Sequence, residues 1–436
     1  MLSKEQAQAL IQKVASSTKY YATVSIYQSE QGVTRFANSE ISQNVTITNG
    51  SATITLYDGK KRVTCTTNAL LESGMEQLVQ DAESMLAFVP EGEFAPFPFS
   101  TEPIPSRDSS GILAQNFGPI QRAQYIKDGM VLLSDGFTAS GALTLSSAVY
   151  ALGDSNGGFR YAHFQRVDFN TVVTHESGAD GAGECMSYTT PPDILAHFKK
   201  AQATAQAAIN PIEPELGAFT VVLSPGAFAD LISFTSWMLN AKAVDQGISF
   251  ASGKIGQKVF GDNLTITDDV TNPELFPMYF DMEGNPTQVL PLIKNGVIEN
   301  VVYNNKYAAK AGVKTTGHAM GANAAGPANI VVAAGDGTYA TVADIIKDTP
   351  NGIFINEFHY TNFVNPRELQ ITGLTRNGTF RIQNGEITKP LSTLRFTESL
   401  LNAFKNITAI SEDRAVVSGS LVPAVRIEGF HFTSKA

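Results

Sequence analysis

The feature that most constrains the fold is the recurrence of Asn-Gly and Asp-Gly dipeptides between short runs of alternating apolar and polar residues. These dipeptides readily adopt the positive φ angles of tight turns, which join neighbouring antiparallel strands. Near the N-terminus, Asn49-Gly50 and Asp58-Gly59 separate strand-like runs at 45–48, 52–57 and 62–66. The same signal recurs at Asn295-Gly296, Asp336-Gly337, Asn377-Gly378 and Asn384-Gly385. The sequence therefore predicts antiparallel strands in both halves of the chain.

Helical segments are interspersed with these strands. Ser3 and Gln6 have the spacing of a capping box and precede apolar residues at helical intervals. Further helices are predicted at 75–86, 114–133 and 193–208, and after Ser224-Pro225. The expected fold class is α+β, with an N-terminal α+β domain that contains an antiparallel meander. A large, predominantly antiparallel β domain with a few helices is expected to follow.

The length of 436 residues exceeds what one hydrophobic core usually supports, so several domains are expected. Residues 90–111 contain five prolines among polar residues, which is typical of an extended connector. We therefore predict an N-terminal domain over 1–111, a middle helix and hairpin region over 112–218, and a C-terminal β-rich domain over 219–436.

Composition narrows the possible functions. The net charge of −10 repels phosphate backbones, so nucleic acid is not an expected partner. Apolar runs fall short of the roughly 20 residues that span a bilayer, so no membrane partner is expected. The first residues lack a secretory pattern, and Cys65 and Cys185 show no metal-binding spacing. We expect a cytoplasmic protein.

Two short motifs resemble catalytic signatures but lie in unsuitable local structure. His175-Glu176 lacks a second histidine at helical spacing, and the surrounding residues 167–188 read as a β-hairpin. Residues 153–157, GDSNG, match the nucleophile elbow, but strand patterns stand on both sides where a following helix is required. Both motifs are therefore expected to be turns or strand ends.

Several other residues are candidates for a binding cleft. The helix after Ser224-Pro225 carries an apolar stripe, and Trp237 lies off that stripe, where it could line a cleft or form an interface. His318 lies in a small-residue loop that could approach a ligand closely. Strand alternation places His359 and Glu357 on one side, where they could exchange protons or form a structural hydrogen bond.

Five segments, taken in order, resemble the TldD/PmbA family, whose members are named for zinc-dependent proteolysis and for modulation of DNA gyrase. They are residues 35–90, LGDSNG at 152–157, VVLSPGAFADLI at 221–232, SFASGKIGQKV at 249–259, and TGLTRNGTFRIQNGEITKPLSTLRFTESLLNAF at 372–404. In the TldD branch, a His-Glu pair and a second histidine lie on the helix after the V-V-L-x-P-G strand, and a further ligand lies in the C-terminal segment.

The resemblance implies that these metal positions are replaced here. The helical positions hold SFTSWM, residues 233–238, and the late position falls near Thr375-Arg376-Asn377. An arginine at a zinc position would repel the ion. The chain is therefore expected to be PmbA-like, with no catalytic residue, metal ligand or cofactor of its own, and zinc is expected only in a TldD-like partner. The cleft residues expected from this reading are Trp237, His318, Thr375 and Arg376.

This resemblance implies a non-catalytic subunit of a heterodimeric metalloprotease that acts on unfolded or extended peptides, and a homodimer when the chain is alone. Two alternatives stay open. The chain could be a hydrolase on its own, with His318, Glu357 and His359 as its polar residues. It could also be a homodimeric peptide-binding module.

Overall fold

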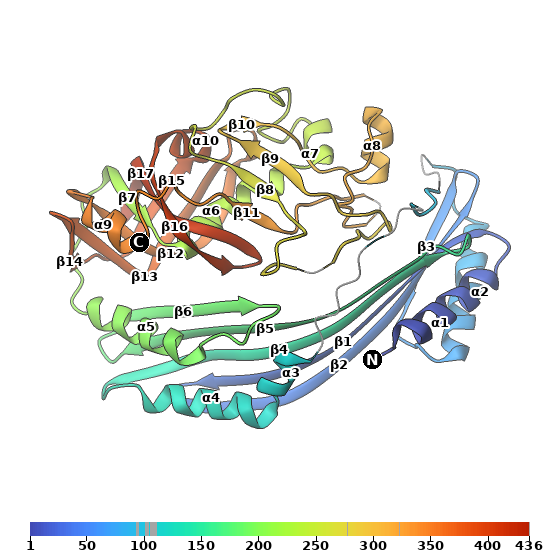
Figure 1. Cartoon of the computed structure of the whole chain (residues 1–436), viewed down its shortest axis with the longest axis horizontal. Coiled ribbons are helices and arrows are strands. Elements are labelled where there is room, and N and C mark those ends of the chain that lie inside the picture. Colours follow the sequence, from blue (N-terminus) through green and yellow to red (C-terminus); the bar gives the residue numbers. More distant parts are fainter. Residues whose placement is uncertain (93–95, 101–103, 105–110, 277, 322, 436) are drawn as a thin grey trace.

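The computed structural model describes residues 1–92, 96–100, 104, 111–276, 278–321 and 323–435. These residues form two lobes, a long curved sheet with helices at its ends and a compact C-terminal lobe above it (Figure 1). Within these ranges, no helix combines the length and the apolar character needed to cross a bilayer. The fold is α+β, as the sequence predicts.

The lower lobe is built on an antiparallel sheet with the strand order β3-β2-β1-β4-β5-β6. The strands are β1 (Tyr21–Ala37), β2 (Glu40–Asp58), β3 (Lys61–Thr67), β4 (Phe137–Asp154), β5 (Phe159–His175) and β6 (Asp180–Ser187). The hairpin predicted over 167–188 is confirmed by the pairing of β5 with β6. The turn at Asp58-Gly59 is confirmed between β2 and β3, because Asp58 pairs with Lys61.

The turn predicted at Asn49-Gly50 is wrong. Asn49 and Gly50 lie within β2 and pair with Ser29 and Gln28 of β1, because β2 continues through them as one long strand. The chain reverses instead at Asn38-Ser39, where both residues have positive φ angles. Asn-Gly permits a turn but does not require one when a partner strand extends past it.

Strands from both sides of the proline-rich segment belong to this one sheet. β1 pairs with β4 from Thr23 opposite Asp154 to Phe36 opposite Gly141. The boundary expected near residue 111 therefore does not divide the sheet, since the strands before and after it share a continuous ladder.

Helices cover the two ends of the lower sheet. They are α1 (Lys4–Ser16), α2 (Glu72–Leu86), α3 (Ile112–Asn116), α4 (Pro119–Val131) and α5 (Ile194–Ala207). α1 and α2 enclose one apolar core, and α3, α4 and α5 enclose a second core at the other end (Figure 1). The Ser3–Gln6 capping box and the Asp193 cap are both confirmed. The single helix predicted over 114–133 is two helices, since Pro119 starts a new one at its first turn.

The upper lobe contains a larger, mostly antiparallel sheet. Its strands are β7 (Gly217–Leu223), β8 (Ile266–Asp268), β9 (Leu290–Lys294), β10 (Val297–Ile298), β11 (Ile330–Val332), β12 (Asn351–Asn365), β13 (Gln370–Gln383), β14 (Glu386–Pro390), β15 (Leu394–Ser399), β16 (Ile407–Val417) and β17 (Ser420–Lys435). The pairs β11–β17 and β7–β12 are parallel. β17 also pairs with β7, so part of the sheet closes on itself.

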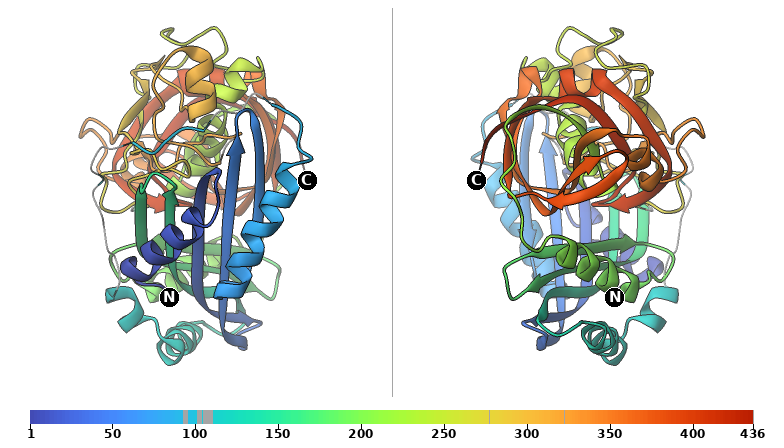
Figure 2. Two further views of the ribbon diagram at one scale, coloured as in Figure 1. Left: turned by 90° about the vertical axis from the view of Figure 1, so that its right-hand side faces the viewer. Right: turned by 90° about the vertical axis from the view of Figure 1, so that its left-hand side faces the viewer.

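The helices of the upper lobe are α6 (Pro225–Met238), α7 (Ala241–Asp245), α8 (Asn305–Ala311), α9 (Val342–Lys347) and α10 (Leu400–Ala403), with 3₁₀ turns at Pro366–Glu368 and Phe404–Asn406. α6 contributes many side chains to the large apolar core of this lobe, and Figure 2 shows the strands curving around it. Ser224 caps α6 as predicted, because its hydroxyl accepts a hydrogen bond from the backbone N–H of Ala227.

Three further Asn-Gly signals have different outcomes. Asn384-Gly385 joins β13 to β14, and Asn295-Gly296 joins β9 to β10, so both predicted turns are confirmed. The turn predicted at Asn377-Gly378 is wrong, because both residues lie inside β13. They retain positive φ angles of 52° and 115°, so the strand is distorted there instead of reversing.

Candidate functional site

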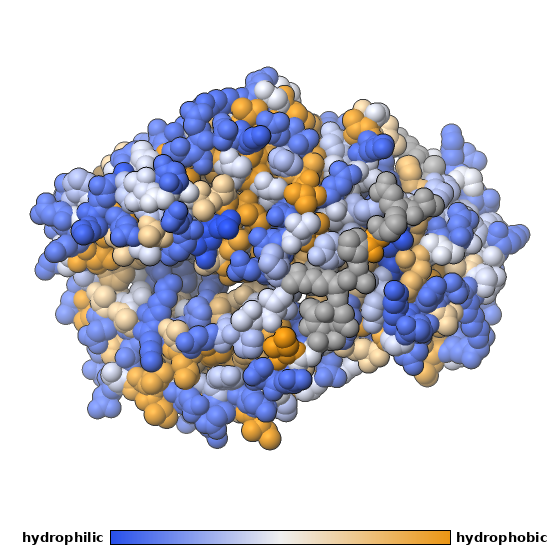
Figure 3. Space-filling view, in the orientation of Figure 1, coloured by the Kyte–Doolittle hydropathy of each residue, from blue (hydrophilic) through white to orange (hydrophobic). Residues whose placement is uncertain are grey.

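The distorted part of β13 borders a cavity of about 440 Å³ between the two lobes. Figure 3 shows the surface hollowed between the lobes on the left of the view, where Figure 1 places β13 and α5. The turn after β5 and the end of α5 line the cavity from the lower lobe, and the distorted strand, β12 and the segment before β15 line it from the upper lobe. The lining residues are Gly178, Ala179, Asp180, Ala208, Pro211, His359, Leu374, Thr375, Arg376, Asn377, Gly378, Thr379, Leu391, Ser392 and Thr393. Each lobe therefore supplies one wall.

The backbone at Asn377-Gly378 is fixed by close contacts. A Cβ on Gly378 would lie 2.7 Å from Thr204 Cγ2 of α5 and 3.2 Å from Asn356 Cβ, so the lower lobe packs directly against this glycine. Asn356 Nδ2 donates to the Asn377 carbonyl at 2.9 Å. Because φ is +115° at Gly378, side-chain-bearing residues are strained there. The strand is thus held in a shape that presents Arg376 and Asn377 to the cavity.

Arg376 and His359 form an exposed basic pair on the upper wall. Arg376 Nη1 lies 3.0 Å from His359 Nε2, so the guanidinium donates and that imidazole nitrogen accepts. Thr375 is completely buried, and its hydroxyl accepts from the backbone N–H of Leu394 at 3.1 Å. Thr375 therefore supports the wall, and Arg376 is the side chain free to meet a ligand.

Carboxylates gather around this basic pair. Burial raises the pKa of Glu357 to about 7, and the nearby Glu184 adds to the rise, while the hydrogen bond from Asn377 Nδ2 to Glu357 Oε2 at 2.7 Å opposes it. Desolvation also raises the pKa of Glu184, although this side chain keeps contact with solvent. Desolvation raises the pKa of Asp180 as well, against the attraction of Arg376. Glu357 can therefore exchange a proton near neutral pH, as groups in functional clefts often do.

Sequence reasoning did not single out Asp180 or Glu184. Both lie on β6, in the hairpin whose histidine and glutamate lack a metal-binding pattern, and only the packing of the lobes brings them to β12 and β13. Glu184 lines a second cavity of about 190 Å³, which continues along β6 toward the turn between β16 and β17. The lower lobe thus places one β6 carboxylate, Asp180, in the first cavity and another, Glu184, in the second.

The N-terminus of α6 lies beside Glu184 and Asn356. Ser224 Oγ donates to the Asn356 carbonyl at 2.5 Å, and a Cβ on Gly226 would lie 3.8 Å from Glu184 Oε1. The helix continues into the core of the upper lobe. It therefore begins beside Glu184, and the segment 233–238 lies at its other end.

That segment makes structural contacts. Ser233 Oγ donates to the Asp230 carbonyl at 2.7 Å. The Phe234 ring meets the Phe363 ring edge-on at 4.8 Å, and Met238 packs in the core. Across residues 233–238 the side chains are three hydroxyls, two aromatic rings and a thioether.

The other predicted cleft residues lie elsewhere. Trp237 is 66% exposed, and its ring centre is 6.1 Å from that of Phe363. His318 is buried, with Nδ1 3.0 Å from Thr316 Oγ1 and Nε2 3.5 Å from Asp268 Oδ2. The structure thus brings Thr375 and Arg376 to one cavity and places Trp237 and His318 outside its lining.

The two motifs that resemble catalytic signatures have structural partners. Ser155, in the turn between β4 and β5, accepts from the Ala22 backbone N–H at 2.8 Å. His175, at the end of β5, has Nδ1 2.9 Å from Ser177 Oγ. Both positions agree with the expected turn and strand end.

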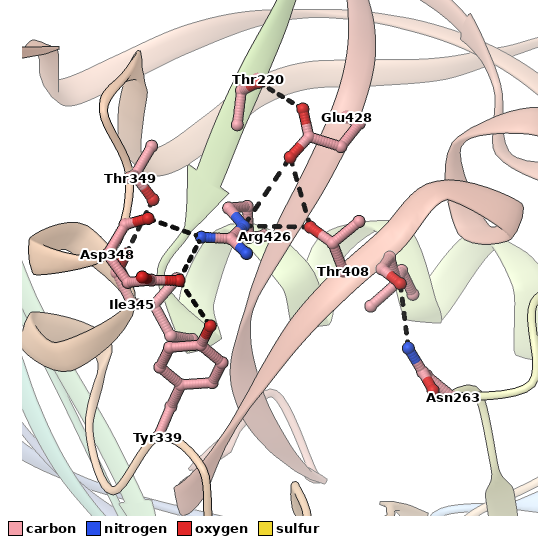
Figure 4. A network of polar contacts seen from close by, with 10 residues as sticks. Thr220, Asn263, Tyr339, Ile345, Asp348, Thr349, Thr408, Arg426 and Glu428 are labelled. Carbon is pink, nitrogen blue, oxygen red and sulfur yellow. Dashed lines mark hydrogen bonds and ion pairs between the residues drawn. The ribbon is translucent and has the colours of Figure 1, made fainter.

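A second polar network lies beside β17 and α9 (Figure 4). Arg426 Nη1 lies 3.0 Å from Asp348 Oδ2, Tyr339 OH donates to the same carboxylate oxygen at 2.6 Å, and Arg426 Nε donates to Thr408 Oγ1 at 3.0 Å. The positive charge of Arg426 is therefore compensated within the lobe, and this network stabilises the packing of α9 against β17. Arg376 has no comparable carboxylate hydrogen bond among the contacts of the described residues.

Comparison with known proteins assigns the family. Residues 216–434 match the model of the PmbA/TldA metallopeptidase C-terminal domain. The chain belongs to the TldD/PmbA family. An uncharacterised protein of Methanocaldococcus jannaschii is 32% identical over 205 residues, which cover 44% of this chain and 45% of that protein. The chain thus spans about half the length of several curated relatives that it matches.

Two other relatives match along nearly the whole chain. A protein named metalloprotease PmbA homologue from Haemophilus influenzae is 20% identical over 94% of this chain and 93% of its own length. The crystal structure of TldE from Thermococcus kodakarensis aligns with a TM-score of 0.87 and 18% identity, over 98% of this chain and 99% of that one. The TldD/PmbA fold therefore covers both lobes.

The name of the family, a metallopeptidase, implies a metal ion. Zinc in proteins is held by thiolate, imidazole or carboxylate ligands. The side chains of Ser233, Phe234 and Met238 supply none of these, and Arg376 brings a positive charge to the cleft. Across the described residues, no group of three or more His, Cys, Asp or Glu is placed to hold an ion. The residues present do not fit a zinc site.

Proposed function

We propose that this chain is the PmbA-like, non-catalytic subunit of a heterodimeric metalloprotease of the TldD/PmbA type. The single observation that carries the proposal is the chemistry of residues 233–238 of α6, whose side chains contact Asp230, Phe363 and the core and offer no zinc ligand. In this proposal a TldD-like partner provides the zinc and performs hydrolysis.

The cleft between the lobes supports a role in handling peptides. It is open to solvent, it has Arg376 and His359 on the upper wall, and it has Asp180, from the edge strand of the lower sheet, on the opposite wall. An extended peptide offers N–H and C=O groups along its length and can add to a strand edge such as β6. We propose that this subunit holds or encloses unfolded or extended peptides beside the partner's metal, and that it forms a homodimer when alone.

Zinc content and peptide cleavage test this proposal. The chain is purified without chelators in two forms: alone, and co-expressed with a TldD-like protein that carries the His-Glu pair and the second histidine. For each preparation, the zinc content per chain and the cleavage of an unfolded peptide are measured. We expect substoichiometric zinc and no cleavage for the chain alone, and both zinc and cleavage in a co-purifying complex. One zinc per isolated chain with cleavage would contradict the proposal.

One observation favours a hydrolase that acts alone. Glu357, with its pKa raised to about 7, lies on the same strand as His359, whose partner Arg376 lines the cleft. In this alternative, His359→Ala and Glu357→Gln abolish cleavage by the isolated chain, and His318→Ala serves as a control because His318 lies elsewhere. Peptide binding by a homodimer, without a partner and without cleavage in any preparation, would instead identify a peptide-binding module.

A further inference from the structure

We propose that the cavity beside Arg376 binds the carboxylate at the free C-terminus of a peptide. This inference rests on the proposed function only in taking a peptide as the ligand. It assigns one end of that peptide to one described cavity.

Arg376 is the side chain that selects a carboxylate. Its guanidinium is exposed, lines the cavity, and uses Nη1 toward His359 Nε2 at 3.0 Å. A guanidinium has five N–H donors in a planar fork, which matches the two oxygens of a carboxylate. Because His359 accepts from Nη1, it orients the fork while the other donors stay available for a ligand.

Asn377 supplies the complementary group. It is 8% exposed, and its Nδ2 donates to Glu357 Oε2 at 2.7 Å, which fixes the orientation of the amide. Its Oδ1 is buried and has no hydrogen-bond partner among the described residues. Buried polar atoms nearly always take part in a hydrogen bond, so we expect a ligand to supply the donor for this oxygen. The last residue of a peptide brings both a carboxylate and a backbone N–H, which match Arg376 and Asn377.

The remaining walls agree with a short peptide end. The volume of about 440 Å³ lies within the roughly 300–1,000 Å³ of small-molecule pockets. Hydroxyls line the cavity at Thr379, Ser392 and Thr393. Asp180 faces Arg376 across the cavity from the lower lobe, so its charge attracts the guanidinium when no ligand is present.

The charges around the cavity favour a monocarboxylate over a phosphate. Asp180 lines the cavity, Glu184 and Glu357 lie near it, and the whole chain has a net charge of −10. A doubly charged anion would be repelled by these groups more strongly than a singly charged one. A peptide carboxylate therefore fits better than a nucleotide or phosphopeptide.

The test measures binding by the full chain without its partner and without hydrolysis. An unfolded peptide with an N-terminal fluorophore is compared with the same peptide ending in a carboxamide, by fluorescence polarisation. We expect the free acid to bind about tenfold more tightly, since charge-assisted hydrogen bonds contribute this much. Arg376→Gln should weaken binding of the free acid to the level of the amide and leave the amide unchanged, and Arg376→Lys should restore part of the difference.

Arg381→Gln is the matched control. Arg381 lies on the same strand, but it pairs with Glu215 and does not line the cavity, so this variant should keep the tenfold difference. Thermal melting checks that each variant is folded. The proposal is overturned if the wild type binds both peptides equally, binds neither, or keeps its preference after Arg376→Gln. It is also overturned if inorganic phosphate displaces the free-acid peptide at lower concentration than acetate does. The zinc and cleavage assay is separate, so failure here leaves the subunit assignment standing.

Discussion

Two Asn-Gly dipeptides in this chain give the same turn signal in the sequence, yet their backbone conformations differ. Asn49-Gly50 is an ordinary extended part of β2, paired with β1 and outside the lining of the cavity. Asn377-Gly378 has positive φ at both residues and distorts β13 where the two lobes meet. The dipeptide permits unusual backbone angles, but it adopts them only where surrounding packing requires them. The distorted backbone therefore lies at the cleft. Substitutions in the two dipeptides should lower the stability of the protein by unequal amounts.

The largest expected difference comes from adding one methyl group to each glycine. Gly378→Ala should lower the free energy of unfolding by about 3 kcal/mol, because a positive φ and contacts with Thr204 and Asn356 both oppose a Cβ. Gly50→Ala should change it by less than about 0.5 kcal/mol, since its Cβ meets the movable end of Leu70 and makes an ordinary van der Waals contact with Gln28 at 3.7 Å. Chemical denaturation of both variants measures the difference. Equal losses would show that the distortion is not under strain.

The neighbouring asparagines should differ less. Asn377→Ala removes the hydrogen bond to Glu357 and places alanine at a φ of +52°, so we expect a loss of about 2 kcal/mol. Asn49 is exposed on a regular strand, and Asn49→Ala should be neutral within about 0.5 kcal/mol. The same denaturation experiment compares them. A neutral Asn377→Ala would mean that the amide does not hold the strand in place.

The smallest effect concerns the pH dependence that the cleft creates. The pKa of Glu357 rises from 4.5 to about 7 on folding, so the folded chain holds this proton more tightly than the unfolded chain does. That contribution to stability is full below pH 4.5 and is lost as the pH rises toward 7. The full pKa rise corresponds to about 3 kcal/mol, and because this side chain keeps some contact with solvent we expect a smaller effect. Glu357→Gln should therefore be about 1 kcal/mol more stable than the wild type at pH 8 and equal to it near pH 4.5.

Denaturation at several pH values checks this behaviour. Glu386→Gln, on the exposed strand β14, is the matched control for replacing a carboxylate by an amide at the surface. A gain for Glu357→Gln at low pH instead of high pH would contradict the assigned protonation.

Local signals predicted most of the elements of the fold. Caps at Ser3, Asp193 and Ser224 act through atoms within a few residues, so their helices begin where the sequence indicates. The pairing of β1 with β4 depends on residues more than a hundred positions apart, and no local signal indicates it. The same limit explains Asn49-Gly50, where the partner strand decides between a turn and an extended strand.

The candidate site divides in the same way. Arg376 was identified by its place in a family segment, and the structure puts it in a cavity. Asp180 and Glu184 come from the other lobe, so their relation to Arg376 depends on packing that no pattern within β6 reveals. The small residues around His318 indicate a loop that could approach a ligand closely. In the structure they allow the imidazole to be buried against Asp268 instead.

The ladder between β1 and β4 has a consequence for synthesis of the protein. When the nascent chain has emerged only as far as β3, one edge of β1 is paired with β2 and the other edge has no partner. The second edge can pair only after β4 has left the ribosome. Unpaired strand edges are sites of association between chains. The open edge of β1 is therefore the place where a chaperone would be expected to bind during synthesis. Expression of the first ninety residues alone should give aggregates.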